Sequence, residues 1–312
     1  MKGPLFYSKI LLFGEYGIIK DSKGLSIPYN FFKGALKTDD HLSEKAKSSN
    51  QSLEKYFHYL SDLQDKEPEL VSFNLDALKA DVEGGMYFDS SIPQGYGIGS
   101  SGALVAAIYD KYSIEKITVL ENLTREKLLK LKTIFGKMES FFHGKSSGLD
   151  PLNSYLSLPI LINSQENIES TSLPSQNLNG KGAVFLLDSG ITGETAPMVQ
   201  IFMEKMKHEG FRKVLMDEFI KHTDACVEDF VSGNVKSLFG NLKQLSNVVL
   251  DHFKPMIPKE FHNLWKHGIE TNDYYLKLCG SGGGGYILGF TQDLDKAKTA
   301  LKGHHLEVVY NF

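Results

Sequence analysis

The sequence has few cysteines, no long apolar run and no excess of positive charge. Its two cysteines, Cys226 and Cys279, are too few among 312 residues for a disulfide framework and fit a reducing compartment. No run of about 18 apolar residues exists, which excludes a membrane-spanning helix. Lys9 and Glu15 interrupt the apolar stretch after Leu5, so no signal peptide is expected. A net charge of −4 provides no basic field for nucleic acid. These absences predict a cytoplasmic protein that binds neither nucleic acid nor a membrane.

What the sequence has is a globular composition with both strand and helix patterns. Hydrophobic residues make up 41% and charged residues 23%, and 312 residues are enough for two domains or one large one. β-Branched and aromatic runs predict strands on both sides of Gly14 within residues 5–19, and at 24–30, 31–36, 86–90, 182–188, 274–279 and 286–290. Apolar residues at helical spacing predict helices within 38–66, after residue 102, and at 124–142, 195–206, 211–232 and 235–252.

The most distinctive stretch is the loop of residues 93–102, which has three alternating glycines followed by Ser100 and Ser101. Glycine permits positive φ, so that backbone N–H groups can face one concavity. An apolar run follows and predicts a buried helix, whose N-terminus would attract an anion. The loop therefore predicts a site for a di- or triphosphate, with a serine hydroxyl on phosphate or magnesium. An ordinary glycine-rich loop that caps a core helix is the alternative that this spacing leaves open.

Three better-known phosphate motifs do not fit. Residues 97–102 match G-x-G-x-x-G, but Pro93 breaks the strand that should run into the first glycine of a dinucleotide fingerprint. Gly144-Lys145-Ser146 resembles the end of a Walker loop, yet Glu139 occupies the position of its first glycine. No H-R-D or D-F-G follows, which excludes the protein-kinase signature.

Polar residues and glycines in three other segments also suggest a site. Lys9 and Glu15 stand in an apolar segment and each need a partner or a cleft, although an edge strand with Lys9 in solvent is the simpler alternative. Residues 143–151 form a second loop rich in Ser and Gly, in which Asp150 precedes a proline and is expected to be extended. Residues 280–285 contain five glycines between two apolar strands, which predicts a backbone lying against a ligand rather than a plain turn.

In combination, residues 9–17, 93–102 and 277–285 resemble the three motifs of the GHMP kinases (galactokinase, homoserine kinase, mevalonate kinase and phosphomevalonate kinase), in the family's order. Residues 9–15 and 143–150 are most similar to mevalonate kinase. The resemblance implies an α+β fold of two domains with the active site in the cleft between them. The N-terminal ATP-binding domain, residues 1–160, would be ribosomal protein S5 domain 2-like with a left-handed crossover, and the C-terminal domain, residues 161–312, ferredoxin-like.

The resemblance also implies an ATP- and Mg²⁺-dependent transfer of phosphate to a small-molecule alcohol, with mevalonate as the first choice. Asp150 would be the catalytic base and Lys9 its partner, whereas Ser101 and Glu139 would hold the magnesium. These roles agree with phosphoryl transfer as positioning plus charge neutralisation. The resemblance further implies phosphate contacts from Gly95, Tyr96, Gly97, Ile98, Gly99, Ser100, Ser101, Gly282 and Gly283. It implies acceptor contacts from Glu15, Tyr16, Thr195 and Ser281.

Some departures from the mevalonate kinase pattern leave the acceptor open. Tyr16 stands where mevalonate kinases usually have histidine, and Gly102 follows the two serines where alanine is usual, both more like phosphomevalonate kinases. Ser146 replaces a frequent proline. Phosphomevalonate or a sugar therefore remains an alternative acceptor, and a non-catalytic, ligand-sensing homologue is the alternative of another class. A monomer or a homodimer is expected. A phosphorylated acceptor would need additional cations, for which the nearby candidates are Lys9, Lys20, Lys23 and Lys145.

Overall fold

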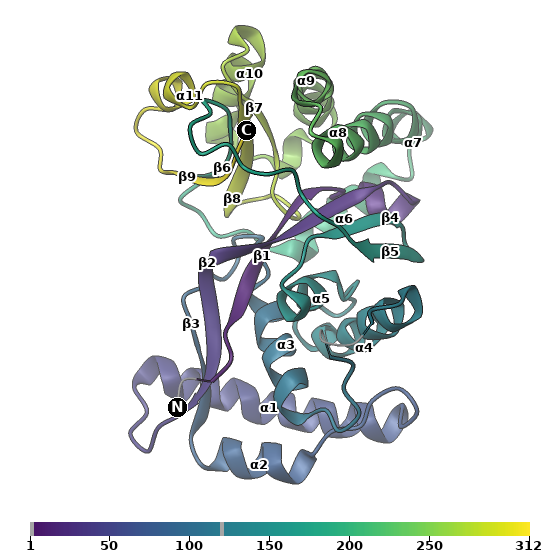
Figure 1. Cartoon of the computed structure of the whole chain (residues 1–312), viewed down its shortest axis with the longest axis vertical. Helices are drawn as coiled ribbons and strands as arrows, with labels where there is room; N and C mark the ends of the chain where they lie inside the picture. Colours follow the sequence, from purple (N-terminus) through teal and green to yellow (C-terminus); the bar gives the residue numbers. More distant parts are fainter. Residues whose placement is uncertain (1–2, 119–121) are drawn as a thin grey trace. The chain divides into compact units, whose positions relative to one another are not determined.

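The computed structural model describes residues 3–118 and 122–312, which form two compact units of mixed helix and sheet (Figure 1). The predicted two-domain α+β fold is confirmed. Strands β1 (Phe6–Phe13) and β2 (Gly24–Thr38) each run from one unit into the other. Each unit is thus assembled from three segments, which are Met1–Lys9, Pro28–Pro93 and Gly99–Leu158 for unit 1, and Ile10–Ile27, Gln94–Ile98 and Pro159–Phe312 for unit 2. The assignment of residues 1–160 and 161–312 as the two domains stays a prediction.

Unit 1 combines parts of β1 and β2 and the whole of β3 (Met86–Ser90) with several helices. These strands belong to a five-stranded sheet in the order β1-β2-β4-β5, with β3 also paired to β2. In that sheet, β4 is Ile160–Ser164 and β5 is Asn167–Ser170. The last five residues of β2 pair antiparallel with β3. The helices of this unit are α1 (Glu44–Lys66), α2 (Leu75–Glu83), α3 (Ser100–Tyr112), α4 (Arg125–His143) and α5 (Leu149–Leu156). The predicted helices within 38–66 and at 124–142 are confirmed, and the Thr124 hydroxyl caps α4 by accepting from the N–H of Lys127 at 3.4 Å.

Helix α3 lies at the centre of unit 1, because it is apolar almost all round. It packs against α4 and α5, and the rings of Tyr109, Phe135 and Tyr155 meet edge to face with centroids 5.0 to 5.5 Å apart. Gly102 makes the approach to α5 possible, since a Cβ atom there would lie 2.7 Å from the backbone carbon of Asp150. The sequence of α3 therefore places Ser101 directly beside the start of α5.

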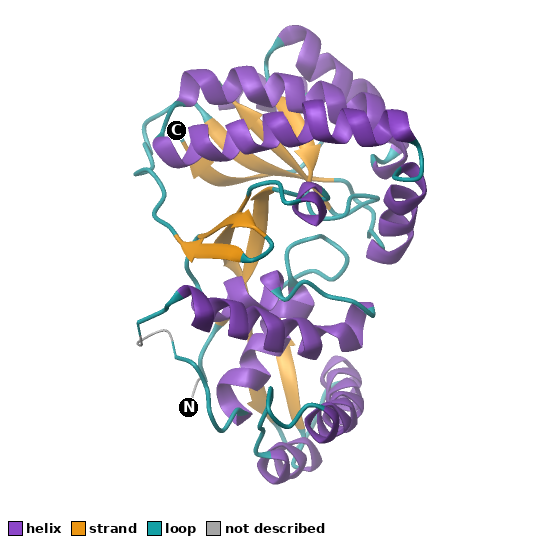
Figure 2. Cartoon of the chain, turned by 90° about the vertical axis from the view of Figure 1, so that its right-hand side faces the viewer, coloured by secondary structure: helices purple, strands orange, loops and turns teal. Residues whose placement is uncertain are grey.

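Unit 2 is built on a four-stranded antiparallel sheet, in the order β7-β8-β6-β9. Helices α8 and α9 pack together, and α9 packs on β7, so that both lie over one face of this sheet (Figure 2). The first residues of β2 pair with β4, which pairs with β5. The sheet strands are β6 (Ala183–Asp188), β7 (Tyr275–Leu278), β8 (Tyr286–Thr291) and β9 (Leu306–Asn311). The helices are η1 (Gly17–Lys20), α6 (Thr195–Lys205), α7 (Glu209–Val214), η2 (Leu215–Ile220), α8 (Lys221–Ser232), α9 (Val235–His252), η3 (Lys254–Met256), η4 (Lys259–Phe261), α10 (His262–Thr271) and α11 (Leu294–Ala300).

Three local predictions are wrong. The strands expected at 24–30 and 31–36 are one continuous strand, β2. Pro28 does not interrupt this strand, because it lies outside the residues of β2 that pair with β3 and with β4. The second strand expected after Gly14 is the 3₁₀-helix η1, which follows a tight turn with Tyr16 at φ 59°. Asp150 is helical rather than extended, since Gly148 turns the chain into α5 at φ 74° and proline is tolerated in a first helical turn.

Among the helices of residues 3–118 and 122–312, none combines the length and the apolar character needed to cross a membrane.

Candidate active site

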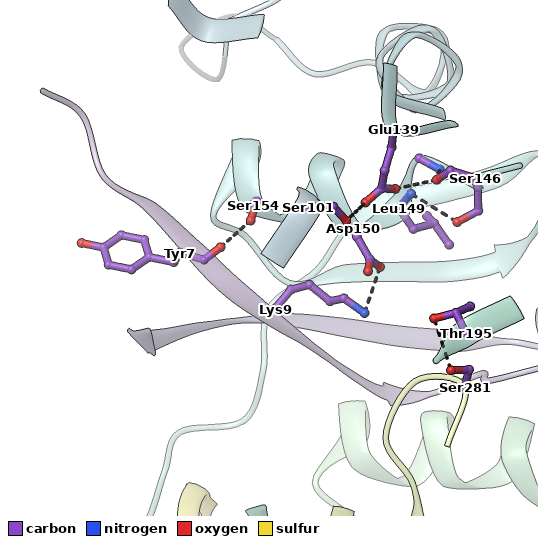
Figure 3. A network of polar contacts seen from close by, with 12 residues as sticks. Tyr7, Lys9, Ser101, Glu139, Ser146, Leu149, Asp150, Ser154, Thr195 and Ser281 are labelled. Atoms are coloured by element: carbon purple, nitrogen blue, oxygen red, sulfur yellow. Dashed lines mark hydrogen bonds and ion pairs between the residues drawn. The ribbon is translucent and has the colours of Figure 1, made fainter. Parts of the chain in front are cut away.

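Lys9 and Asp150 form an ion pair within unit 1 (Figure 3). The Lys9 Nζ atom, from β1, lies 2.9 Å from Oδ1 of Asp150, in the first turn of α5. The Lys9 side chain is 4% exposed, whereas that of Asp150 is 36% exposed. Gly99 packs closely against Lys9, since a Cβ atom at residue 99 would lie 3.0 Å from Lys9 Cγ. A buried cation thus holds a carboxylate that solvent, or a ligand hydroxyl, can reach.

Glu139 lies on α4 with its carboxylate between two serine hydroxyls (Figure 3). Ser101 Oγ donates to Oε1 at 2.8 Å, and Ser146 Oγ donates to Oε2 at 2.5 Å. The residue is 3% exposed. Burial, followed by repulsion from Asp150, raises the pKa of Glu139 to about 7, although both hydroxyls and Lys9 oppose this rise. A buried carboxylate without a full positive partner is an environment that a bound cation would stabilise.

The donor set around Glu139 fits Mg²⁺. Carboxylate and hydroxyl oxygens are hard donors, and Mg²⁺ usually takes one or two protein carboxylates and completes its shell with water and substrate phosphates. In the described parts of the chain, no three His, Cys, Asp or Glu side chains gather in a way that could hold a metal ion. Glu139 and Ser101 would therefore hold Mg²⁺ only as part of a larger shell of ligand and water oxygens.

The first glycine loop is divided between the two units at residues 98 and 99. In unit 1, Gly99 has φ 79° and precedes α3, so that Ser100 and Ser101 begin the helix. The N–H groups at such a helix start lack helical partners and favour an anion. In unit 2, Ile98 is buried and anchors the rest of the loop. The structure therefore places both serines at a helix N-terminus, as an anion site requires.

The two glycine-rich segments meet within unit 2. A Cβ atom on Gly97 would lie 2.6 Å from the carbonyl oxygen of Cys279, and one on Gly285 would lie 2.4 Å from Cα of Tyr96. Gly95 accepts a backbone hydrogen bond from the N–H of Gly193 at 2.9 Å. Residues 97 and 285 must be glycine because the backbones of residues 95–97 and 279–285 are in direct contact. This contact is a physical reason for the glycines at residues 280–285.

Gly282 and Gly283 have their own backbone contacts in unit 2. Gly283 donates its N–H to the carbonyl of Met256 at 2.7 Å, and a Cβ atom on Gly282 would lie 2.6 Å from the same oxygen. The Gly283 N–H thus already has a protein acceptor. The phosphate contacts expected of these two glycines stay predictions.

The residues expected to contact the acceptor also lie together in unit 2. The Tyr16 hydroxyl donates to the carbonyl of Ser281 at 2.7 Å, and Ser281 Oγ donates to Thr195 Oγ1 at 3.4 Å (Figure 3 shows the latter). Glu15 is buried and accepts a hydrogen bond from Lys277 Nζ at 2.7 Å. Burial and the Glu15 carboxylate raise the pKa of Tyr16, which keeps its hydroxyl protonated.

The structure thus brings the predicted site residues together in two groups, one in each unit. Two contributors were given no role by sequence reasoning, Ser146 and Lys277. Lys277 carried a usable signal, because a single cation in an apolar strand needs a partner just as Lys9 does. Ser146 stands out in the sequence only as the replacement of a frequent proline, and its position seven residues after Glu139 gives no sign of a contact with that residue.

Comparisons with known proteins bear on the family and on the fold. Residues 69–157 match the family model described as the GHMP kinases N-terminal domain. No curated protein matches the sequence.

Solved structures share the fold over the whole chain. A mevalonate kinase from L. major, in complex with R-mevalonate, is 17% identical and has a TM-score of 0.64, covering 100% of this chain and 99% of the other. A phosphomevalonate kinase from Streptococcus pneumoniae, with phosphomevalonate and AMPPNP, is 13% identical with a TM-score of 0.62 and covers 99% and 100%. A galactokinase from Lactococcus lactis, complexed with galactose, is 13% identical with a TM-score of 0.60 and covers 98% and 92%. Residues 69–157 thus match the GHMP kinases N-terminal domain model, and the chain as a whole is similar in fold to mevalonate kinase.

Proposed function

We propose that this chain is a kinase that transfers the γ-phosphoryl group of ATP to the primary hydroxyl of mevalonate. The observation that supports it most directly is the ion pair between buried Lys9 and accessible Asp150. In the proposed step the acceptor oxygen forms a bond to the γ-phosphorus while the bond to the β-phosphate oxygen breaks. The hydroxyl proton passes to an Asp150 carboxylate oxygen, and Lys9 stabilises the negative charge that develops on the acceptor oxygen.

The remaining groups would bind and neutralise the nucleotide. The helix start at Ser100 and Ser101 and the loop before it would contact the phosphates through backbone N–H groups. Ser101 and Glu139 would hold Mg²⁺, which when bound neutralises charge on the phosphates. Glu139 and Asp150 thus take different roles because one carboxylate is buried between hydroxyls and the other is held by an ammonium group.

The choice of mevalonate over a phosphorylated acceptor is supported by the lysines. Of the four cations that could bind a second phosphate, Lys9 pairs with Asp150 at 2.9 Å and Lys23 with Glu228 at 2.5 Å. Lys9 is already engaged at the reacting hydroxyl, and Lys23 would have to exchange its carboxylate partner for the second phosphate. We therefore place phosphomevalonate second, and we include it in the test because a phosphomevalonate kinase shares the fold.

A coupled assay of ADP release tests the proposal, with Mg·ATP and, in turn, mevalonate, phosphomevalonate and galactose. Turnover is expected with mevalonate. Asp150→Asn should lower kcat by about 10²- to 10⁴-fold because the proton acceptor is lost. Asp110→Asn, which removes a partly buried carboxylate of α3 that is paired with Lys116, is the matched control and should leave kcat unchanged.

Two results would contradict the proposal. Turnover with phosphomevalonate or galactose alone would keep the kinase and change the acceptor. No ADP release with any acceptor, together with retained nucleotide binding, would indicate a ligand-sensing protein instead.

A further inference from the structure

Ser146 contacts two parts of the candidate site through one hydroxyl group. Its Oγ donates to Oε2 of Glu139 at 2.5 Å and accepts from the N–H of Gly148 at 3.0 Å. Figure 3 shows Ser146 and Ser101 on opposite sides of the Glu139 carboxylate. All of these residues belong to unit 1. The hydroxyl thus links a carboxylate on α4 with the N-terminal cap of α5.

The loop that carries Ser146 is itself held firmly against α4. A Cβ atom on Gly148 would lie 2.0 Å from the carbonyl oxygen of Lys132, so the backbone there is in direct contact with the helix. The Ser146 N–H donates to Ser140 Oγ at 3.4 Å, and Ser140 donates to the carbonyl of Gly136 at 2.6 Å. The Ser146 hydroxyl is therefore presented to Glu139 from a fixed backbone rather than from a free loop.

The Glu139 carboxylate needs such support because the last torsion of a glutamate side chain has a broad, shallow energy profile. With the hydrogen bond from Ser101 alone, the Glu139 carboxylate could still rotate about the axis of that hydrogen bond. A second hydrogen bond, to the other oxygen, fixes the plane of the carboxylate. The same serine oxygen binds the Gly148 N–H, and Asp150 follows two residues later in the first turn of α5.

We propose that Ser146 is a positioning residue, which fixes the Glu139 carboxylate for a divalent cation and the first turn of α5 for Asp150. This inference rests on the proposed function, because it assumes that the cation and the phosphoryl acceptor bind at these two carboxylates. Residues that orient a metal ligand typically change metal affinity by about 10- to 100-fold when they are removed. Ser146→Ala should therefore weaken the binding of Mn²⁺, with ADP present, by about 10-fold or more.

The test measures free Mn²⁺ by electron paramagnetic resonance during titration of the whole chain, with and without ADP. Ser52→Ala is the matched control, because it removes an exposed hydroxyl of unit 1 that donates only to the carbonyl of Ser48, and it should keep the wild-type Mn²⁺ affinity. Ser140→Ala removes the acceptor of the Ser146 N–H and thus tests the loop backbone separately from the Ser146 hydroxyl. Ser146→Thr retains a hydroxyl and should recover most of that affinity. In the coupled assay, Ser146→Ala should lower kcat and leave the KM for mevalonate within about twofold, since it displaces reacting groups rather than removing a binding contact.

Three outcomes would overturn the inference, and they are distinguishable from one another. If wild type binds Mn²⁺ with ADP and turns over while Ser146→Ala does so equally well, the role of Ser146 is refuted and the proposed function stands. If Ser140→Ala weakens Mn²⁺ binding as much as Ser146→Ala does, the loop backbone, not the hydroxyl, positions Glu139. A wild-type chain that binds no Mn²⁺ with ADP would refute both the inference and the proposed function.

Discussion

Two acidic side chains of unit 1 differ because of what surrounds them. Asp150 is 36% exposed and holds an ammonium group at 2.9 Å, whereas Glu139 is nearly inaccessible and meets only hydroxyl groups at both oxygens. Desolvation disfavours the charged form of a carboxylate, and a nearby cation favours it. The surroundings therefore suit Asp150 to act as a base, and Glu139 to receive a cation.

The stability of the metal-free protein should depend on the ionisation of Glu139. Its folded-state pKa of about 7 lies above the ordinary value of 4.5. Below pH 4.5 both states keep the proton, and between 4.5 and 7 the unfolded state releases a proton that the folded state retains. Stability should therefore fall as pH rises through this window and then level off, by up to about 3 kcal/mol. In Glu139→Gln this loss should be absent.

Urea unfolding at a series of pH values, in the presence of a chelator, measures this effect as the difference between wild type and Glu139→Gln. Using the difference removes the contributions of the other titrating groups, which both proteins share. Parallel profiles from pH 4 to 8 would show that Glu139 is ionised at its ordinary pKa.

Part of the site could be predicted at the residue scale. Lys9, Ser101 and Asp150 are marked by sequence patterns and Glu139 by the resemblance alone, and the structure brings all four together within unit 1. Their roles were implied by resemblance and stay predictions. Ser146 could not be selected, because its importance comes from the partners that the fold places on each side of its hydroxyl.

Among the elements, the contact between α3 and α5 depends on a glycine. Gly102→Ala should gain about 1 kcal/mol of helix propensity, yet its Cβ would lie 2.7 Å from the Asp150 backbone carbon and 2.8 Å from Pro151 N. Overpacking of a tight contact typically costs about 1–3 kcal/mol. We expect a net loss of stability and a lower kcat, because α5 must move and carries Asp150.

Gly240→Ala is the matched control for this substitution. Gly240 lies in α9, and a Cβ atom there has no other atom within 4 Å, so alanine should stabilise the protein by about 0.5–1 kcal/mol. Urea unfolding measures both variants. A Gly102→Ala variant as stable as Gly240→Ala would contradict the close packing of α3 on α5.

The buried ion pair of Glu15 and Lys277 should show strong coupling in a double-mutant cycle. Their side chains are 4% and 5% exposed, so removing one partner leaves the other charge buried. We expect Lys277→Met to cost about 3–5 kcal/mol, and the double variant with Glu15→Gln to recover a large share of that loss.

The exposed pair of Glu204 and Lys207, at 59% and 68% exposure, provides the comparison. The same two substitutions there should change the free energy of unfolding by less than about 1 kcal/mol, because solvent screens the charges. Equal coupling energies for the two pairs would contradict the burial of Lys277.

Element prediction from the sequence succeeded where the pattern was long and failed where the chain turns. The periodic apolar residues of α1, α4 and α9 identified these helices, and the β-branched run of β6 identified that strand. The single strand β2 is predicted as two strands, at 24–30 and 31–36, whereas its pairing with β1, β3 and β4 keeps it extended throughout. The 3₁₀-helix η1 is too short to leave a periodic signal.

At the scale of the whole molecule, the two units share strands, and we expect them to unfold together. Residues 6–9 and 10–13 of β1 belong to different units, and β2 is divided in the same way after Ile27. Unfolding of either unit would release the end of a strand that the other unit needs. Differential scanning calorimetry should therefore show one transition, with equal van't Hoff and calorimetric enthalpies. Two resolved transitions would contradict this expectation.

Because β1 and β2 each contribute residues to both units, the chain cannot be divided into two fragments that each contain one complete unit. A fragment that ends near Leu158 would still encode the portions of β1 and β2 that pack in unit 2, without the sheet strands that follow in the sequence. A fragment that begins at Pro159 would lack the residue 10–27 segment, and with it the Glu15 that neutralises Lys277. Reporter fusions, truncations and exchanges with relatives would therefore have to transfer the complete reading frame, since no single cut separates one self-sufficient half from the other.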